Sequence, residues 1–155
     1  VTDSIYNAFL ADYSEGKAFM HSHTYAGNPL ACSCALAVIK ILKRDNIIEK
    51  ANELGQWLSK EFEQRFMQID KVGGVRHIGL INALELVKDR STKEPFDSSL
   101  RLGYRIYQNA LKKGLLLRPI GDILYFNPPL NIKKEELKKA MDIAYEAITE
   151  ELSKI

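Results

Sequence analysis

The stretch that decides the fold is HSHTYAGNPLACSCALAVIKIL, residues 21–42. Asn28 can cap free backbone N–H groups, and Pro29 follows at the first helical position, where a missing N–H costs nothing. From Leu30 to Leu42 the residues are apolar nearly all round, which is typical of a helix that is buried on most sides. A domain of this size cannot bury such a helix alone. We therefore expect the helix to pack against further chain or another subunit.

The loop before this helix carries imidazole and hydroxyl side chains, and two chemical interpretations follow. His21 and His23 stand two residues apart and can face one ion, but a zinc site needs a third protein ligand and none stands at motif spacing. We therefore expect no metal here. Ser22 and Thr24 carry hydroxyls in front of a helix N-terminus, whose free N–H groups and positive dipole end favour an anion such as phosphate. The residues alone leave open whether the loop binds phosphate or only starts the helix.

The rest of the chain predicts an α+β domain, in which helices cover one face of a small, mostly antiparallel sheet. Asn46 and Glu49 resemble a capping box at the start of an amphipathic helix that runs to about Phe66. The other expected elements are one extended strand kinked at Gly79, a helix, two short strands in a hairpin-like connection, and a final helix. In that order they occupy residues 75–87, 98–113, 115–117, 123–126 and 131–152.

Arg118 is a second candidate binding residue, in the segment LLLRPIGD. It ends a run of leucines, and Pro119 fixes the turn after it, which suits bidentate capture of a carboxylate. The alternative is a surface ion pair with Asp122. Tyr125 follows in the next short strand and either points to the same side as Arg118 or belongs to the core.

Composition excludes several classes of protein. The 155 residues are 46% hydrophobic, enough for the core of one domain. The net charge of +2 argues against binding nucleic acid through bulk charge. No apolar run reaches the roughly 20 residues that a membrane span needs. Cys32 and Cys34 predict two small buried side chains rather than a disulfide, which fits a reducing, cytoplasmic compartment.

Three segments, in order along nearly the whole chain, resemble the class III aminotransferases, which depend on pyridoxal 5'-phosphate. FMHSHTYAGNPLACSCALAVI, residues 19–39, is similar to the H-G-H-T-Y-x-G-N-P-L-A segment of that family. VRHIGLINALELVKDRSTKEPF and LLLRPIGDILYFNPPLNIKKEEL resemble its R-x-x-G and R-P-x-G segments. The resemblance implies the C-terminal part of a fold-type I transferase. Residues 1–44 would end the large cofactor-binding domain, and residues 45–155 would form the small domain.

The resemblance also assigns site residues position by position. His23 and Thr24 match the pair that contacts the cofactor phosphate across the interface of a homodimer. Ser22 matches a position, usually Gly, that lines the substrate pocket, and its larger side chain narrows that pocket. Arg118 matches the arginine that binds the substrate carboxylate, and Tyr125 matches a tyrosine near that end of the substrate.

Within the family, the same segments are most similar to enzymes of biotin synthesis. These move an amino group from adenosylmethionine, or in some relatives lysine, to 8-amino-7-oxononanoate. The family's cofactor lysine lies upstream of a helix resembling TDSIYNAF, so it would fall before Val1. We therefore expect no catalytic residue in this chain and no activity from it alone. Two alternatives stay open: an aminotransferase of ornithine, 4-aminobutyrate or an ω-amino acid, and a binding module that uses the anion loop without chemistry.

Overall fold

Helix α2, Pro29–Arg44, begins where the sequence predicts it. The side chain of Asn28 accepts a hydrogen bond from the N–H of Ala31 at 3.1 Å, which caps the helix. Within this chain no residue of α2 is buried, and Leu30 is 79% exposed. The expectation that further chain or another subunit covers this helix stays a prediction. A helix that is apolar nearly all round needs neighbours on several sides, and the elements described here supply none.

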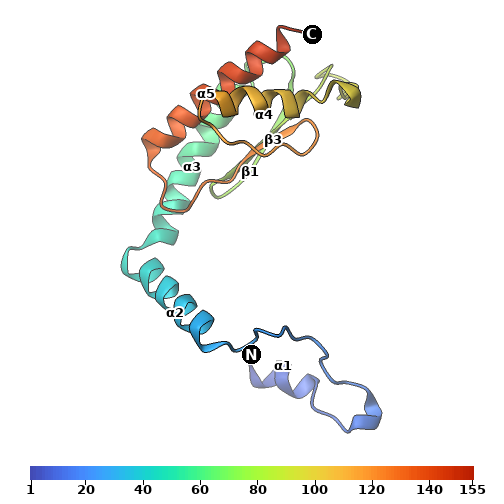
Figure 1. The fold of residues 1–155 in the computed structure, drawn as a ribbon, viewed down its shortest axis with the longest axis vertical. Helices are drawn as coiled ribbons and strands as arrows, with labels where there is room; N and C mark the ends of the chain where they lie inside the picture. The colour runs from blue at the N-terminus through green and yellow to red at the C-terminus, as the bar shows by residue number, and fades with distance from the viewer. The chain divides into compact units, whose positions relative to one another are not determined.

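The computed structural model describes all 155 residues, which form two units, Val1–Lys40 and Ile41–Ile155 (Figure 1). The first unit contains α1, Asp3–Ala8, and a 3-10 turn, Tyr13–Glu15. It also contains most of α2, on which the two cysteines are free thiols. Both thiols are exposed, so the expectation that they are buried is not met within this chain, because no other element of the chain covers α2.

Helix α3, Ile47–Phe66, opens the second unit, but the predicted capping box does not form. Asn46 has a left-handed backbone, with φ 51°, and its side chain makes no cap hydrogen bond. Its N–H instead binds the carbonyl oxygen of Lys43 at 3.3 Å, at the end of α2, while its own carbonyl oxygen accepts the N–H of Lys50 at 3.2 Å, at the start of α3. This is a position at which asparagine is tolerated because it accepts the left-handed conformation.

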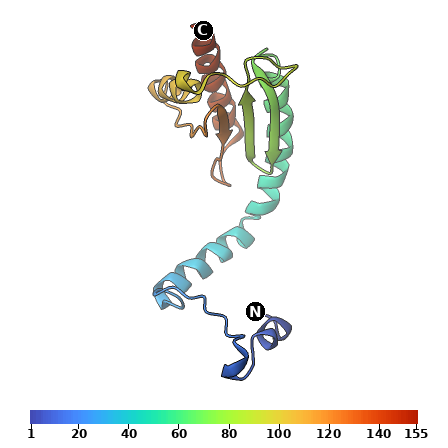
Figure 2. The same cartoon turned by 90° about the vertical axis from the view of Figure 1, so that its right-hand side faces the viewer.

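The sheet has three antiparallel strands in the order β1-β2-β3 (Figure 2). The predicted single strand over residues 75–87 is wrong: β1, Val72–Ile78, and β2, Ile81–Leu86, form a hairpin. The chain reverses between them because Gly79 takes a φ of +54°, which is open to glycine without strain.

The remaining predicted elements are partly confirmed. The expected helix over residues 98–113 is a 3-10 turn, Ser98–Leu100, followed by α4, Leu102–Lys112, because Arg101 breaks the run with φ 46°. Strand β3, Ile123–Phe126, pairs with β2, and residues 115–117 form no strand. Helix α5, Lys134–Leu152, closes the chain. No helix combines the length and the apolar character that crossing a bilayer requires.

The core of the second unit lies on one face of this sheet, as predicted. Leu84, Leu124 and Phe126 are at most 5% exposed, whereas the alternate residues Ala83 and Tyr125 are partly exposed. Helix α3 packs on β1 and β2, α5 packs on α3, and α4 packs on α5. The fold is therefore α+β, with a small antiparallel sheet covered by helices on one face.

Candidate functional site

The predicted phosphate loop, residues 22–24, lies in the first unit and is exposed. A turn carries the chain from this loop into α2: the N–H of Ala26 binds the carbonyl oxygen of His23 at 2.9 Å. Gly27 then takes a φ of +72°, and a Cβ atom there would meet nothing within 4 Å. The glycine is therefore needed for the left-handed turn and not for close packing inside this chain.

Few hydrogen-bond donors remain free at the start of α2. Pro29 has no N–H, and the side chain and carbonyl oxygens of Asn28 take the N–H groups of Ala31 and Cys32. The free helix N–H groups expected from the sequence therefore reduce to that of Leu30. The hydroxyls of Ser22 and Thr24 make no hydrogen bond within the chain.

These donors suit a phosphate, which accepts hydrogen bonds on several oxygens. Two free hydroxyls, the His23 imidazole and one helix N–H are available on an open surface. They include no lysine or arginine, so a phosphate site built on them needs further groups.

His21 and His23 contact each other edge to face, with ring centroids 5.2 Å apart. His21 also contacts Phe19, at 5.6 Å, and Phe19 contacts Phe9 at 5.1 Å. His21 thus lies between Phe19 and His23 in a row of rings within the first unit. No group of three His, Cys, Asp or Glu side chains has an arrangement that could hold a metal ion.

Arg118 lies in the second unit and is exposed. The predicted alternative, an ion pair with Asp122, does not form. Oδ1 of Asp122 instead accepts a hydrogen bond from the N–H of Gly103 at 3.0 Å, in the first turn of α4. A carboxylate is stabilised in that place by the N–H group and by the helix dipole. The guanidinium of Arg118 is therefore left without a partner in this chain and can bind a carboxylate.

Tyr125 lies on the uncovered face of the sheet and not in the core. It stands opposite Ala83 on β2, and its neighbours Leu124 and Phe126 point into the core instead. Its ring makes no cation–π contact with Arg118. Arg118 and Tyr125 share the second unit, whereas Ser22, His23 and Thr24 belong to the first.

Gly103 is the site-related residue that the sequence pattern does not single out. Glycine inside a predicted helix is a general signal of close packing, but nothing in the local sequence identifies the neighbour. The neighbour is the turn after Arg118, which lies 16 to 19 residues away along the chain.

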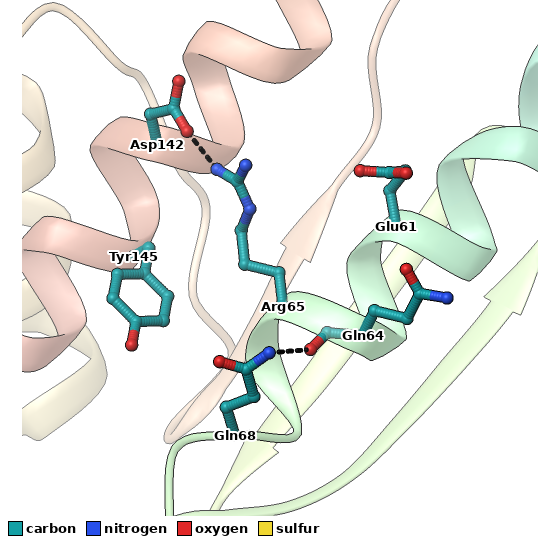
Figure 3. A pocket seen from close by; sticks show the side chains of 6 residues that line it. All are labelled: Glu61, Gln64, Arg65, Gln68, Asp142 and Tyr145. Atoms are coloured by element: carbon teal, nitrogen blue, oxygen red, sulfur yellow. Dashed lines mark hydrogen bonds and ion pairs between the residues drawn. The ribbon is translucent and has the colours of Figure 1, made fainter.

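A cavity of about 440 Å³ opens between α3 and α5 (Figure 3). Arg65 on α3 forms an ion pair with Asp142 on α5, and Nε2 of Gln68 binds the carbonyl oxygen of Gln64 at 2.9 Å (Figure 3). No predicted site residue lines this cavity. Its charged pair joins two helices, so we assign it a structural role.

Glu151 on α5 is the one buried charged residue, with 6% of its surface exposed. Its Oε2 binds two nitrogens of Arg105 on α4, at 2.9 and 3.0 Å, and its Oε1 binds Nζ of Lys154 at 2.5 Å. Burial of Glu151 opposes ionisation, but the hydrogen bonds from Lys154 and Arg105 outweigh it, so its pKa is lowered.

The family model of the class III aminotransferases matches residues 1–148. An adenosylmethionine-8-amino-7-oxononanoate aminotransferase from Methanocaldococcus jannaschii is 42% identical over 149 residues, which cover 96% of this chain and 32% of that protein.

Two of the solved structures that are similar to the chain illustrate the likeness. The crystal structure of adenosylmethionine-8-amino-7-oxononanoate aminotransferase from M. jannaschii has a TM-score of 0.85 at 41% identity, covering 97% of this chain and 34% of that one. A PLP-bound amine transaminase from an uncultivated Pseudomonas species has a TM-score of 0.78 at 33% identity, covering 85% and 30%. The chain thus spans about a third of the length of these relatives.

Proposed function

The chain belongs to the class III aminotransferases, and from this membership we propose that it is the C-terminal part of an enzyme of biotin synthesis. The proposed reaction moves an amino group from adenosylmethionine, or lysine, to 8-amino-7-oxononanoate and gives 7,8-diaminononanoate. The observation that carries the proposal is the 42% identity to the M. jannaschii aminotransferase over 96% of this chain, including all three motif segments.

The unpaired guanidinium of Arg118 supports this substrate. We assign Arg118 to the carboxylate of the oxo acid. Two parallel hydrogen bonds from the guanidinium to this carboxylate would fix the orientation of the substrate. Tyr125, on the uncovered face of the same sheet, would lie near that end of the substrate. A residue that holds the far end of a substrate also fixes how far its ketone reaches, which is a contribution of positioning.

Pyridoxal 5'-phosphate, when bound, supplies the carbonyl group and the electron sink for amino transfer. We assign His23 and Thr24 to its phosphate, and Ser22 to the wall of the substrate pocket. Their exposed donors form only one side of a phosphate site, which agrees with a site that a second subunit completes. We therefore also propose a homodimer, in which the exposed apolar side chains of α2 gain neighbours.

The remaining assignments concern the chain as a part of a longer protein. We propose that residues 1–44 end the large cofactor-binding domain and that residues 45–155 form the small domain. The cofactor lysine would then lie upstream, and residues 1–155 alone would be inactive. The two free thiols fit a reducing, cytoplasmic compartment.

The test uses the full-length protein and follows the two half-reactions separately by the absorbance of the cofactor. Arg118→Ala should weaken the oxo-acid half-reaction about a hundredfold or more, because a charge-assisted bidentate pair is lost, while the donor half-reaction changes little. Equal losses in both half-reactions would contradict the role of Arg118. Residues 1–155 alone should give no Schiff-base absorbance with the cofactor.

The second candidate is an aminotransferase of ornithine, 4-aminobutyrate or another ω-amino compound. The 33% identity to the amine transaminase supports it, whereas Ser22 in place of the usual glycine separates the two candidates only weakly. Turnover of such an amine with pyruvate, together with failure to convert 8-amino-7-oxononanoate, would select this candidate. A binding module without chemistry would turn over neither.

A further inference from the structure

The backbone on either side of Arg118 sets the position of its guanidinium, because the side chain has no partner of its own in the chain. Leu117 before it is 3% exposed and belongs to the core. Pro119 after it has a fixed φ, so the turn that follows cannot relax at its first residue. Whatever holds this turn therefore also decides where Arg118 projects.

The first turn of α4 contacts the turn of residues 119–122 through Gly103. The N–H of Gly103 donates to Oδ1 of Asp122 at 3.0 Å. A Cβ atom at this position would overlap the carbonyl oxygen of Gly121 and would lie 3.2 Å from Cβ of Pro119. The carbonyl oxygen of Asp122 also accepts the N–H of Leu86 at 3.0 Å, which ties the same turn to the sheet.

The turn itself is short and closed. Ile120 and Ile123 exchange two backbone hydrogen bonds, of 2.9 and 3.1 Å. Gly121 between them takes a φ of +58°, a conformation that strains other residues. A closed turn of this kind moves as one body, so a displacement at Gly103 is transmitted to Pro119 and Arg118.

We propose that Gly103 and Asp122 are positioning residues, which hold the turn of residues 119–122 against α4 and thereby place Arg118 for the carboxylate of the oxo acid. This inference rests on the proposed function, because it assumes that Arg118 binds that carboxylate. Misplacement of a binding group by about 1 Å can cost about a hundredfold in rate, so variants here should lose between about tenfold and a hundredfold in kcat/KM for the oxo acid.

The experiment compares four variants of the full-length holoenzyme with the wild type and with Arg118→Ala. Gly103→Ala inserts the overlapping methyl group, and Asp122→Ala removes the acceptor of the Gly103 N–H. Asp122→Asn keeps an oxygen in the same place and should restore near-normal behaviour. Gly74→Ala is the matched glycine control, because a Cβ atom there would meet only Nζ of Lys93, at 3.8 Å.

Four quantities are measured for each variant: kcat/KM for 8-amino-7-oxononanoate, the dissociation constant of this oxo acid, the rate of the donor half-reaction, and the melting temperature. The same aminoketone without its carboxylate serves as a probe. Gly103→Ala and Asp122→Ala should weaken binding of the oxo acid about tenfold or more and leave the donor half-reaction within about twofold. Binding of the probe should be unchanged, because it does not use Arg118.

Normal binding of the oxo acid by both variants would overturn the inference. A loss of equal size with the probe would overturn it too, since that pattern marks general damage to the fold. If Gly103→Ala does not fold, the comparison of Asp122→Ala with Asp122→Asn tests the positioning role instead. A loss with Asp122→Ala that Asp122→Asn restores supports that role. If Arg118→Ala shows the selective loss and these variants do not, the positioning role is wrong and the proposed function stands. If Arg118→Ala shows no selective loss in the oxo-acid half-reaction, the proposed role of Arg118 in binding the carboxylate is wrong.

Discussion

Removal of the charge at Glu151 should destabilise the second unit. Glu151→Gln keeps the shape of the side chain but loses the ion pairs that join α5 to Arg105 on α4 and to Lys154. A hydrogen bond to a charged group contributes about 1.5–3 kcal/mol when it is buried, and an exposed ion pair contributes about 0–1 kcal/mol. The Arg105 pair is largely buried, whereas Lys154 is 54% exposed, so we expect a loss of about 2 kcal/mol at pH 7.

The assay is urea unfolding of the 155-residue chain, followed by the fluorescence of Trp57, the single tryptophan. Trp57 lies on α3 and therefore reports on the second unit. Glu63→Gln is the matched control, because Glu63 is an exposed glutamate on α3 without an ion pair, and it should change stability by less than about 0.5 kcal/mol.

The pH dependence gives the sharper test. The pKa of Glu151 is lowered in the folded chain, so its contribution is present above the pKa of an unfolded glutamate, about 4.3, and is lost as the pH falls through the folded value. The difference between the wild type and Glu151→Gln should therefore shrink below about pH 4. A difference that is the same at pH 7 and pH 3 would refute the electrostatic explanation.

Two further predictions concern the hairpin and the turn after β2. Gly55→Ala should cost about 1–3 kcal/mol in urea unfolding, because a Cβ atom there would lie 2.7 Å from the backbone of Gly79, while Gly74→Ala should cost less. The carboxyl group of Asp89 accepts hydrogen bonds from Ser91 and Thr92, and these bonds lower the pKa of Asp89 to about 2. An NMR titration of the carboxyl carbon should show this value, and a midpoint near 3.9 would contradict the hydrogen-bonded turn.

The elements that the sequence predicts well are those whose signals are local. Helix α2 follows from Asn28 and Pro29, and α5 follows from apolar residues at helical spacing, because capping and periodicity depend on neighbours within a few residues. The hairpin is missed because its turn, at Gly79 and Leu80, lacks the usual polar residues, so residues 75–87 look like one strand.

The predicted site residues also divide into those with a local sequence signal and those that depend on contacts between distant elements. The motifs are sufficient to select Thr24 and Arg118 as candidates, since each stands in a recognisable segment. The local sequence suggests Asp122 as the partner of Arg118 because the two are four residues apart. The actual partner of Asp122 is Gly103, on another element, and a contact of that range leaves no mark on the local pattern.

At the start of α2, helix capping and anion binding would use the same backbone N–H groups. Asn28 and Pro29 make the helix start easy to predict because they satisfy or remove N–H groups that would otherwise be free. The same groups are the ones that a helix N-terminus offers to an anion. Since only the N–H of Leu30 remains, a phosphate bound here depends on side chains, above all on the unpartnered hydroxyl of Thr24. Under the proposed function Thr24 serves binding, whereas Asn28 and Pro29 serve folding, so we expect mutations to separate the two roles.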